Sequence, residues 1–221
     1  MISVVIRTRN ECSNLKVCLK RLSKQTIHHE VIIVDSYSKD DTVKVSEEYG
    51  CKVVQCDDFT FGKALNMGIQ ESKGSFIGIL SGHCFPTNDT FLEVLMNNLF
   101  NEKIAGVYAR QIPHRDTNPL EYRNFIYTYR LEAEIQRRCP FFNNAASMIR
   151  KELWDIVKFD EEVAAQEDII WAREMQRLGY CIAYEPNAIV EHLHNEDTID
   201  TVNRYVREYN VLKKMGVRLC S

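Results

Sequence analysis

Short, uninterrupted runs of apolar, mostly β-branched residues alternate with helix-forming segments from the start of the chain. Three such runs occupy residues 4–6, 31–34 and 76–80, and a fourth, at 51–54, is interrupted by Lys52. The segments between them carry apolar residues at helical spacing, at Leu15, Cys18, Leu19 and Leu22 and over 42–49 and 61–71. Strands that are apolar throughout must be buried on both faces, and helices between them supply that cover. The sequence therefore predicts an α/β protein with a mostly parallel central sheet flanked by helices.

The second half contains further strand and helix signals but no repeat or linker that would divide the chain. We expect strands over 104–110, 145–149, 182–184 and 189–190, and helices over 122–136, 151–154, 167–178 and 197–215. The polar segment 111–121 carries Pro113 and Pro119 and is predicted to be a loop. A chain of 221 residues can bury one full core, so we expect a single domain over 1–221.

Composition and charge exclude several classes of protein. The net charge is −3, and there is no basic run and no stripe of basic and aromatic residues, which argues against nucleic acid binding. The eight cysteines lack Cys-x-x-Cys spacing and support neither a zinc ribbon nor a redox motif. Free thiols, no signal-peptide pattern and no apolar run of about 20 residues predict a cytoplasmic protein. A peripheral contact with the inner face of the membrane is left open.

Polar residues that follow the predicted strands are candidate site residues, because ligands of parallel sheets bind at the carboxyl ends of the strands. Thr8 and Arg9 follow the first strand, where a hydroxyl and a cation could hold a nucleotide. An ordinary capped loop explains these two residues at least as well. Asp35 ends the second strand and could accept hydrogen bonds from a base or a ribose, whereas the aspartates after it fit a helix cap. Ser81 ends the fourth strand.

Lys63 and three histidines are candidate partners of a phosphate and a metal. Lys63 lies in the first turn of a predicted helix and could pair with a phosphate, or be an ordinary surface lysine. His83 directly follows the fourth strand, and an imidazole there could bind a divalent metal. A lone loop histidine is more often simply hydrogen-bonded. His192 and His194 also follow a predicted strand, which strengthens the metal hypothesis.

Adjacent carboxylates at Glu167 and Asp168 begin a predicted amphipathic helix. A helix N-terminus stabilises carboxylates, so one of the two is explained as a cap. The same position can hold an ionised carboxylate that points into a cleft and acts as a general base. The pair therefore suggests acid–base chemistry as well as capping.

These segments, in this order, resemble the family 2 glycosyltransferases, which have the GT-A fold. The resemblance rests on the opening strand and loop at 5–11, on the strand and turn at 33–42 with Asp35, on the helix at 61–69 and on the acidic pair at 167–168. It runs through nearly the whole chain. The segment 80–86, which reads Leu-Ser-Gly-His-Cys-Phe-Pro, is most similar to the rhamnosyltransferase-type members.

The resemblance implies inverting transfer from a nucleotide-sugar donor to a glycan or lipid-linked acceptor, in surface polysaccharide synthesis. Asp168 would be the catalytic base. Thr8, Arg9, Asp35, Lys63 and Ser81 would bind the donor nucleotide, which places the nucleotide-binding half at about 1–110 and the acceptor half at about 111–221. The loop over 110–118 and the aromatic helix after it would shape the acceptor side.

One departure from the family pattern concerns the metal. The family places Asp-x-Asp after the fourth strand, whereas this chain has Ser81, Gly82 and His83 there. By position His83 would be the ligand of a divalent metal, Mn²⁺ or Mg²⁺, with His194 as the second ligand. One imidazole carries less charge than two carboxylates, so the use of a metal stays open.

Two other functions remain open from the sequence. A nucleotidyltransferase would need a glycine-rich phosphate loop after the first strand, and the segment 7–11 contains no glycine. A sugar-nucleotide binding protein without activity is favoured by the missing Asp-x-Asp. Product analysis separates the three functions. Released nucleoside diphosphate indicates glycosyl transfer, released pyrophosphate indicates nucleotidyl transfer, and no turnover indicates a binding protein.

Overall fold

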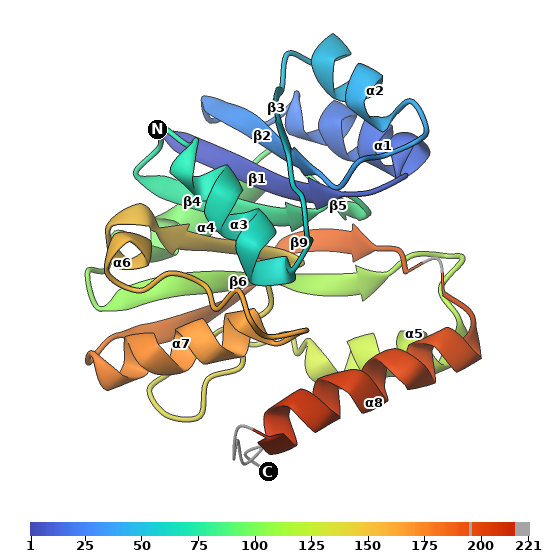
Figure 1. Cartoon of the computed structure of the whole chain (residues 1–221). Coiled ribbons are helices and arrows are strands. Elements are labelled where there is room, and N and C mark those ends of the chain that lie inside the picture. Colours follow the sequence, from blue (N-terminus) through green and yellow to red (C-terminus); the bar gives the residue numbers. More distant parts are fainter. Residues whose placement is uncertain (195, 215–221) are drawn as a thin grey trace.

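The computed structural model describes residues 1–194 and 196–214 (Figure 1). Their strands form one sheet of nine strands in the order β3-β2-β1-β4-β8-β6-β9-β5, and β7 pairs with β9. The strand bounds are β1 Ile2–Thr8, β2 His29–Asp35, β3 Lys52–Gln55, β4 Phe76–Ser81, β5 Cys84–Pro86, β6 Ile104–Pro113, β7 Glu134–Gln136, β8 Ala146–Arg150 and β9 Cys181–His192.

Most of the strands run in the same direction. Strands β1 to β4 pair in parallel. Because β8 is antiparallel to both β4 and β6, and β9 is parallel to β6, strands β6 and β9 run with β1 to β4. The short strands β5 and β7 are antiparallel to β9. The predicted α/β fold with a mostly parallel sheet is therefore confirmed.

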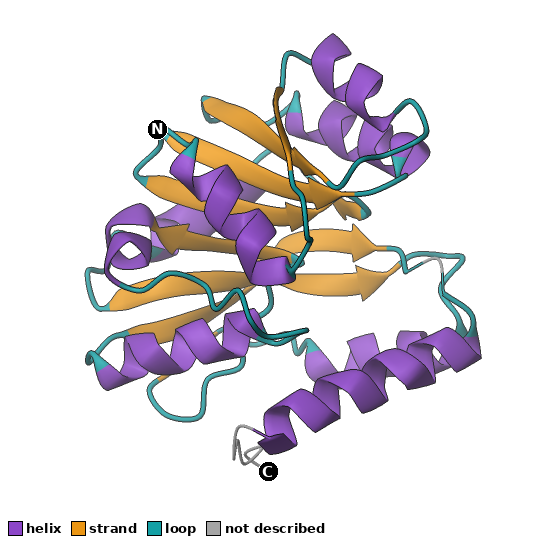
Figure 2. Ribbon diagram, viewed as in Figure 1, coloured by secondary structure: helices purple, strands orange, loops and turns teal. Residues whose placement is uncertain are grey.

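Helices cover both faces of the sheet (Figure 2). One core packs α1 (Cys12–Leu22), α2 (Thr42–Glu48) and α4 (Phe91–Asn98) against the sheet. The other packs α3 (Phe61–Gln70), α6 (Lys151–Ile156) and α7 (Glu167–Arg177) against the opposite face. Helices α5 (Pro119–Thr128) and α8 (Thr198–Lys214) lie side by side beyond the end of the sheet, as Figure 1 shows.

Local sequence explains where several helices begin and end. Thr60 Oγ1 caps α3 by accepting a hydrogen bond from the Lys63 N–H. Asn118 Oδ1 caps α5 by accepting from the Glu121 N–H, and Pro119 occupies the first turn of that helix. Gly50 and Gly179 follow α2 and α7 with φ of +71° and +91°. Positive φ is readily adopted by glycine, which lets the chain leave both helices in a tight turn.

The second half departs from the prediction in several elements. The helix expected through 136 ends at Thr128, and β7 pairs its last residues with β9. The two short strands expected over 182–190 are one long strand, β9, with an irregularity opposite β6. Strand β6 continues to Pro113, into the predicted loop, because residues up to Pro113 pair with β9. In the first half, α4 was not predicted. The predicted end of the last helix lies outside the described residues.

Two further expectations concern the thiols and the membrane. Six cysteines are free thiols, namely Cys12, Cys18, Cys51, Cys56, Cys84 and Cys181. Cys139 is disulfide-bonded, so the expectation of free thiols is confirmed at these six positions and wrong at Cys139. Among the described residues, no helix combines the length and the apolar character needed to cross a bilayer.

Candidate active site

The carboxyl ends of neighbouring strands bring the candidate residues of the first half to one edge of the sheet. In the strand register Thr8 is opposite Asp35, and Arg7 is opposite both Val34 and Ser81. The turn after β4 carries His83, and the end of β9 carries His192 and His194. The same edge thus collects side chains from the two ends of the sequence.

Asp35 is fully buried and shapes the turn after β2. Its two carboxylate oxygens accept hydrogen bonds from the Ser38 N–H at 2.9 Å and the Ser38 hydroxyl at 2.5 Å. The Ser36 N–H donates to the Thr8 carbonyl at 3.1 Å and joins this turn to the loop after β1. Between the two serines, Tyr37 is 48% exposed with φ of +52°. The turn therefore presents an aromatic ring beside a fixed carboxylate.

Arg7 and α3 form the neighbouring part of the edge. The Arg7 guanidinium lies 4.8 Å from the centre of the Phe61 ring and donates to Glu167 Oε1 at 3.1 Å. Lys63, one turn into α3, is partly exposed and forms no ion pair with the residues that the structure describes. Arg9 is exposed and equally unpaired within the described part of the chain. Both cations remain available to an anionic ligand.

Asp168 stands at the N-terminus of α7, partly exposed, beside the buried Glu167. Its oxygens accept hydrogen bonds from the Asn144 N–H at 3.1 Å and the Ile169 N–H at 2.8 Å. Burial, and then the nearby Glu167 carboxylate, raise the pKa of Asp168 above the ordinary aspartate value, against the effect of these two N–H groups and Arg7. A carboxyl group with a raised pKa is a stronger base once it has ionised.

Gln166, which precedes the acidic pair, has φ of +68°. This left-handed conformation costs a residue with a Cβ roughly 1–2 kcal/mol. Its buried Oε1 has no hydrogen-bond partner among the described residues. Backbone strain of this kind gathers at functional sites, which agrees with a role for the start of α7.

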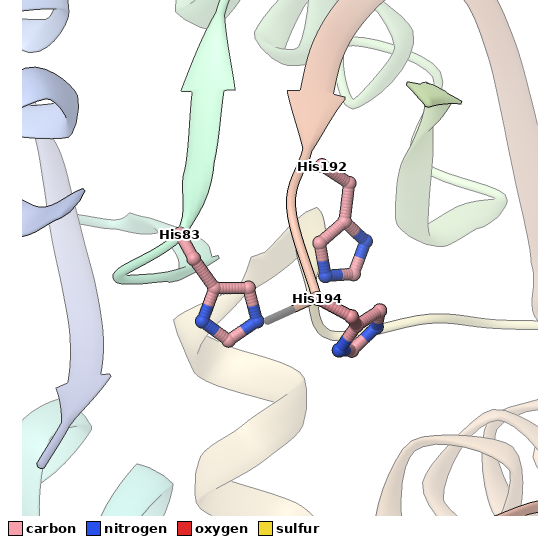
Figure 3. Close-up of side chains that lie close together, drawn as sticks. All are labelled: His83, His192 and His194. Atoms are coloured by element: carbon pink, nitrogen blue, oxygen red, sulfur yellow. The ribbon is translucent and has the colours of Figure 1, made fainter. Parts of the chain in front are cut away.

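Three histidines gather at the same edge of the sheet (Figure 3). His83, His192 and His194 each offer one ring nitrogen, and these nitrogens lie within 4.8 Å of one another. The centres of the His192 and His194 rings are 4.2 Å apart, and the His83 ring stacks on His192 at 5.1 Å. Burial and neighbouring positive charge lower the pKa of His194 to about 2 and that of His192 well below its usual value. The two imidazoles are therefore neutral at physiological pH, the form that binds metals.

A hydrogen-bonded loop joins Asp168 to the histidine cluster. Asn144 donates its N–H to Asp168, and the preceding Asn143 accepts from Gln111 Nε2 at 3.1 Å. Gln111 Oε1 is in turn 2.6 Å from His192 Nδ1. The expected base and the expected metal ligands therefore belong to one connected site.

Sequence reasoning missed several residues of this site. Glu11 accepts a hydrogen bond from Thr8 Oγ1 at 3.2 Å and lies 2.5 Å from His83 Nδ1. Gln111 was assigned to a loop, and Asn143 and Asn144 were not considered. Only Glu11 carried a signal, since it follows the first strand as the candidate nucleotide residues do. The hydrogen bonds that connect the others between Asp168 and His192 join residues 24 or more apart in the sequence.

A family model and curated relatives match this chain. The model described as glycosyl transferase family 2 matches residues 3–157. The O-antigen chain rhamnosyltransferase RfbN of Salmonella typhimurium is 29% identical over 92% of this chain and 70% of the relative. The O-antigen chain rhamnosyltransferase WbaN of Salmonella anatum is 30% identical over 80% of this chain, and the match covers 60% of the relative.

Solved structures of related fold carry nucleotide and metal ligands. A mannosyltransferase from Pyrobaculum calidifontis, in complex with GDP-Man and Mn²⁺, has a TM-score of 0.76 at 16% identity and covers 100% of this chain and 65% of its own. The second structure is glucosyl-3-phosphoglycerate synthase from Mycobacterium tuberculosis in complex with Mn²⁺, UDP and glucosyl-3-phosphoglycerate. It has a TM-score of 0.71 at 19% identity, and the match covers 99% of this chain and 81% of the synthase. At these identities the likeness establishes the fold.

Proposed function

The chain belongs to glycosyl transferase family 2, and from this premise we propose that it is an inverting glycosyltransferase. It moves a sugar from a nucleoside diphosphate donor to a hydroxyl of a glycan or lipid-linked acceptor, in the synthesis of a surface polysaccharide. The observation that carries the proposal is Asp168, a partly exposed carboxylate at a helix N-terminus, linked through Asn144 and Asn143 to the edge of the sheet.

In this reaction Asp168 removes the proton from the acceptor hydroxyl. The acceptor oxygen attacks the anomeric carbon on the face opposite the leaving group, and the bond from that carbon to the diphosphate oxygen breaks. The electron pair of that bond leaves with the nucleoside diphosphate, and the anomeric configuration inverts. The raised pKa of Asp168 supports its role as the base.

The donor nucleotide lies along the carboxyl ends of β1, β2 and β4. Asp35 and Thr8 hold the nucleoside, with the exposed Tyr37 ring available to the base. Arg9, Lys63 and Ser81 contact the diphosphate side, where the two unpaired cations compensate its charge. The lack of ion-pair partners for Arg9 and Lys63 among the described residues supports this assignment.

A divalent metal fits the site, because His192 has a buried Nε2 without a hydrogen-bond partner in the described structure. His83 and His194 are the ligands inferred from position, and their ring nitrogens approach that of His192. Mn²⁺ or Mg²⁺ is the expectation from the family pattern. When bound, the metal would neutralise negative charge on the leaving diphosphate.

The donor sugar is proposed to be a deoxyhexose, rhamnose. This rests on the names of the two Salmonella relatives and on the similarity of segment 80–86 to rhamnosyltransferase-type sequences. The chain spans less than two thirds of one of these relatives, so its acceptor is proposed only as a growing polysaccharide or its lipid-linked precursor.

We also propose a cytoplasmic protein that touches the inner face of the membrane. Helix α8 carries exposed apolar side chains three or four residues apart, at Ile199, Val202, Val206 and Tyr209. Exposed basic residues accompany them at Arg207, Lys213 and Lys214. A helix with an apolar stripe and flanking basic residues suits the surface of an anionic bilayer.

A donor screen tests the proposed activity. Thermal shifts are recorded with a panel of nucleoside diphosphate sugars that includes activated rhamnose, with and without manganese, and the products of the best donor are then analysed. Release of nucleoside diphosphate supports glycosyl transfer. Release of pyrophosphate would establish nucleotidyl transfer instead, and binding without turnover of any donor and acceptor pair would favour a binding protein.

A further inference from the structure

The histidine cluster differs from a carboxylate metal site in its donor atoms. We propose that His83, His192 and His194 together form a three-histidine site for a transition metal of the zinc class, with His192 as a full ligand. The inference deepens the proposed function, because the site would face the diphosphate of the donor. The expected ligands were His83 and His194, with Mn²⁺ or Mg²⁺ as the metal. The inference adds His192 to the ligands and names a zinc-class metal instead.

The tautomer of His192 follows from a chain of hydrogen bonds. The Ala145 N–H donates to Asn143 Oδ1 at 2.9 Å, which fixes the orientation of the Asn143 amide. Gln111 Nε2 donates to the same oxygen, so Gln111 must turn its Oε1 toward His192 Nδ1, 2.6 Å away. An acceptor oxygen at that distance requires a proton on Nδ1. The lone pair of His192 is therefore on Nε2.

That Nε2 atom is buried and has no hydrogen-bond partner among the described residues. A buried acceptor without a donor is costly and rare in folded proteins. The other two imidazoles lie around the same space, as Figure 3 shows, with their nitrogens within 4.8 Å. A cation in this space would satisfy the lone pair of His192 together with those of its neighbours.

Each of the other histidines has a carboxylate at one of its ring nitrogens. Glu11 Oε1 lies 2.5 Å from His83 Nδ1, which leaves Nε2 of His83 for the metal. Glu121 Oε1 is the carboxylate oxygen near His194, 3.8 Å from its Nε2, which is longer than a hydrogen bond. Oxygen acceptors on the outer nitrogen are the usual support of metal-binding histidines, since they fix the tautomer and make the ligand more basic. His83 and His192 have such a partner, in Glu11 and Gln111 respectively.

Gly82 makes room for one of these supports. A Cβ at position 82 would lie 2.6 Å from Glu11 Oε2, so any larger residue would displace that carboxylate. The segment Ser81, Gly82 and His83 is thus compatible with a carboxylate that supports a histidine from behind. A carboxylate that binds the metal directly is absent from these three positions.

The donor set decides the class of metal. Imidazole nitrogens suit Zn²⁺ and its neighbours, whereas Mg²⁺ and Mn²⁺ prefer carboxylate and water oxygens. Zinc–nitrogen bonds are about 2.0–2.1 Å long, and catalytic zinc sites keep a fourth position open. The open position would accept a diphosphate oxygen of the donor.

Metal binding without catalysis tests the inference directly. Protein without a polyhistidine tag is stripped with a chelator and offered Zn²⁺, Mn²⁺ or Mg²⁺, and affinity is measured by competition with a chromophoric chelator. We expect one Zn²⁺ per chain and no displacement by a hundredfold excess of Mg²⁺ or Mn²⁺. Co²⁺ in place of Zn²⁺ should give the visible absorption of a four-coordinate site.

Variants identify the ligands. His192→Ala should abolish tight zinc binding, and Glu11→Gln, which retains the shape of the side chain, should weaken it by about 10–100-fold. His28→Ala removes an exposed histidine and serves as the control, with zinc affinity unchanged. Circular dichroism verifies that each variant is folded. If His192→Ala does not fold, the site is tested by the other two measurements. Unchanged zinc affinity in Glu11→Gln together with a Co²⁺ spectrum that is not four-coordinate would then refute the three-histidine site.

The inference is overturned if Mn²⁺ or Mg²⁺ binds as tightly as Zn²⁺, if no metal binds, or if folded His192→Ala retains zinc with the affinity of the wild type. Its failure is distinct from failure of the proposed function. Sugar transfer by a protein that binds no zinc would refute the metal site and leave the glycosyltransferase standing. Zinc bound by three histidines without turnover of any donor would support the metal site and refute the proposed glycosyltransferase activity.

Discussion

Asp168 is held between groups that push its ionisation in opposite directions. Burial and the Glu167 carboxylate favour the protonated form, whereas two backbone N–H groups and Arg7 favour the charged form. The net effect is a raised pKa, so the base reaches its active, ionised form only above the ordinary aspartate pKa of about 3.9. Activity that depends on this carboxylate must therefore increase with pH through the raised pKa.

Replacing Glu167 with Gln tests this balance. Gln keeps an acceptor for Arg7 Nη1, 3.1 Å away, but removes the negative charge beside Asp168. The pKa of Asp168 should fall, because its ionised form is no longer repelled, and the acid limb of kcat/KM should move to lower pH. A pH profile of transfer measures this shift.

The matched control is Glu162→Gln, which removes an exposed carboxylate from the loop before α7. It should leave the acid limb where it is in the wild type. An acid limb that stays in place in Glu167→Gln, or moves to higher pH, would show that the ionisation of Asp168 does not limit the reaction.

At the scale of single residues, the sequence identified groups whose position on a strand or helix end is itself informative. Asp35, His83 and Asp168 were recognised because each stands next to the end of a predicted element. Gln111 could not be recognised, since its meaning depends on His192 and Asn143, which are 81 and 32 residues away. The predicted strand over 104–110 stopped one residue short of Gln111, which the structure places within β6.

Among the elements, α3 and the segment before α7 depend on one buried amide. Asn66 Oδ1 accepts hydrogen bonds from Trp154 Nε1 at 2.8 Å and from the Phe159 N–H at 3.1 Å. Its Nδ2 donates to the Phe159 carbonyl at 2.9 Å and to Glu161 Oε1 at 2.7 Å. This amide therefore fixes the path of the chain toward α7.

Asn66→Ala should destabilise the protein by about 2–4 kcal/mol, because it leaves the indole N–H and the Phe159 backbone groups unpaired. For a domain of this size that corresponds to a decrease in Tm of roughly 5–15 °C. Thermal denaturation measures the change. The control Asn97→Ala removes an exposed amide from α4 and should cost less than about 0.5 kcal/mol. Equal losses in the two variants would refute the role given to Asn66.

Helix α8 gives a prediction for the membrane contact. We expect the protein to sediment with vesicles of phosphatidylcholine and phosphatidylglycerol, and the double substitution Val206→Asp and Tyr209→Asp to weaken binding by at least about tenfold, since it removes apolar area from the contact. Val17→Asp, on an exposed position of α1, is the control and should have no effect. Unchanged sedimentation of the double variant would contradict the contact.

Strands β1, β2 and β4 were predictable because each contains a buried run of apolar residues. Those of the second half were harder to predict because tertiary pairing decides them. Strand β7 is largely exposed and has no apolar run, and it exists through its pairing with β9. Helix α4 was missed although Phe91, Leu92 and Leu95 have helical spacing and are fully buried.

At the scale of the molecule, the sheet is what turns scattered residues into one site. Parallel strands place Thr8, Asp35 and Ser81 at one edge, and β6 and β9 bring Gln111 and His192 to it from the second half. This convergence was predictable in outline from the strand pattern. The hydrogen-bonded loop that joins the base to the histidines depends on side-chain positions, which no periodicity encodes.

The most direct measurement compares Asp168→Asn with the wild type, in sugar transfer and in nucleoside diphosphate binding by titration calorimetry. Loss of the base should lower kcat/KM by about 10²–10⁴-fold, while nucleotide affinity stays within a few-fold of the wild type. Transfer at the wild-type rate by Asp168→Asn, or a loss of nucleotide binding that parallels the loss of transfer, would contradict the assignment of Asp168 as the base.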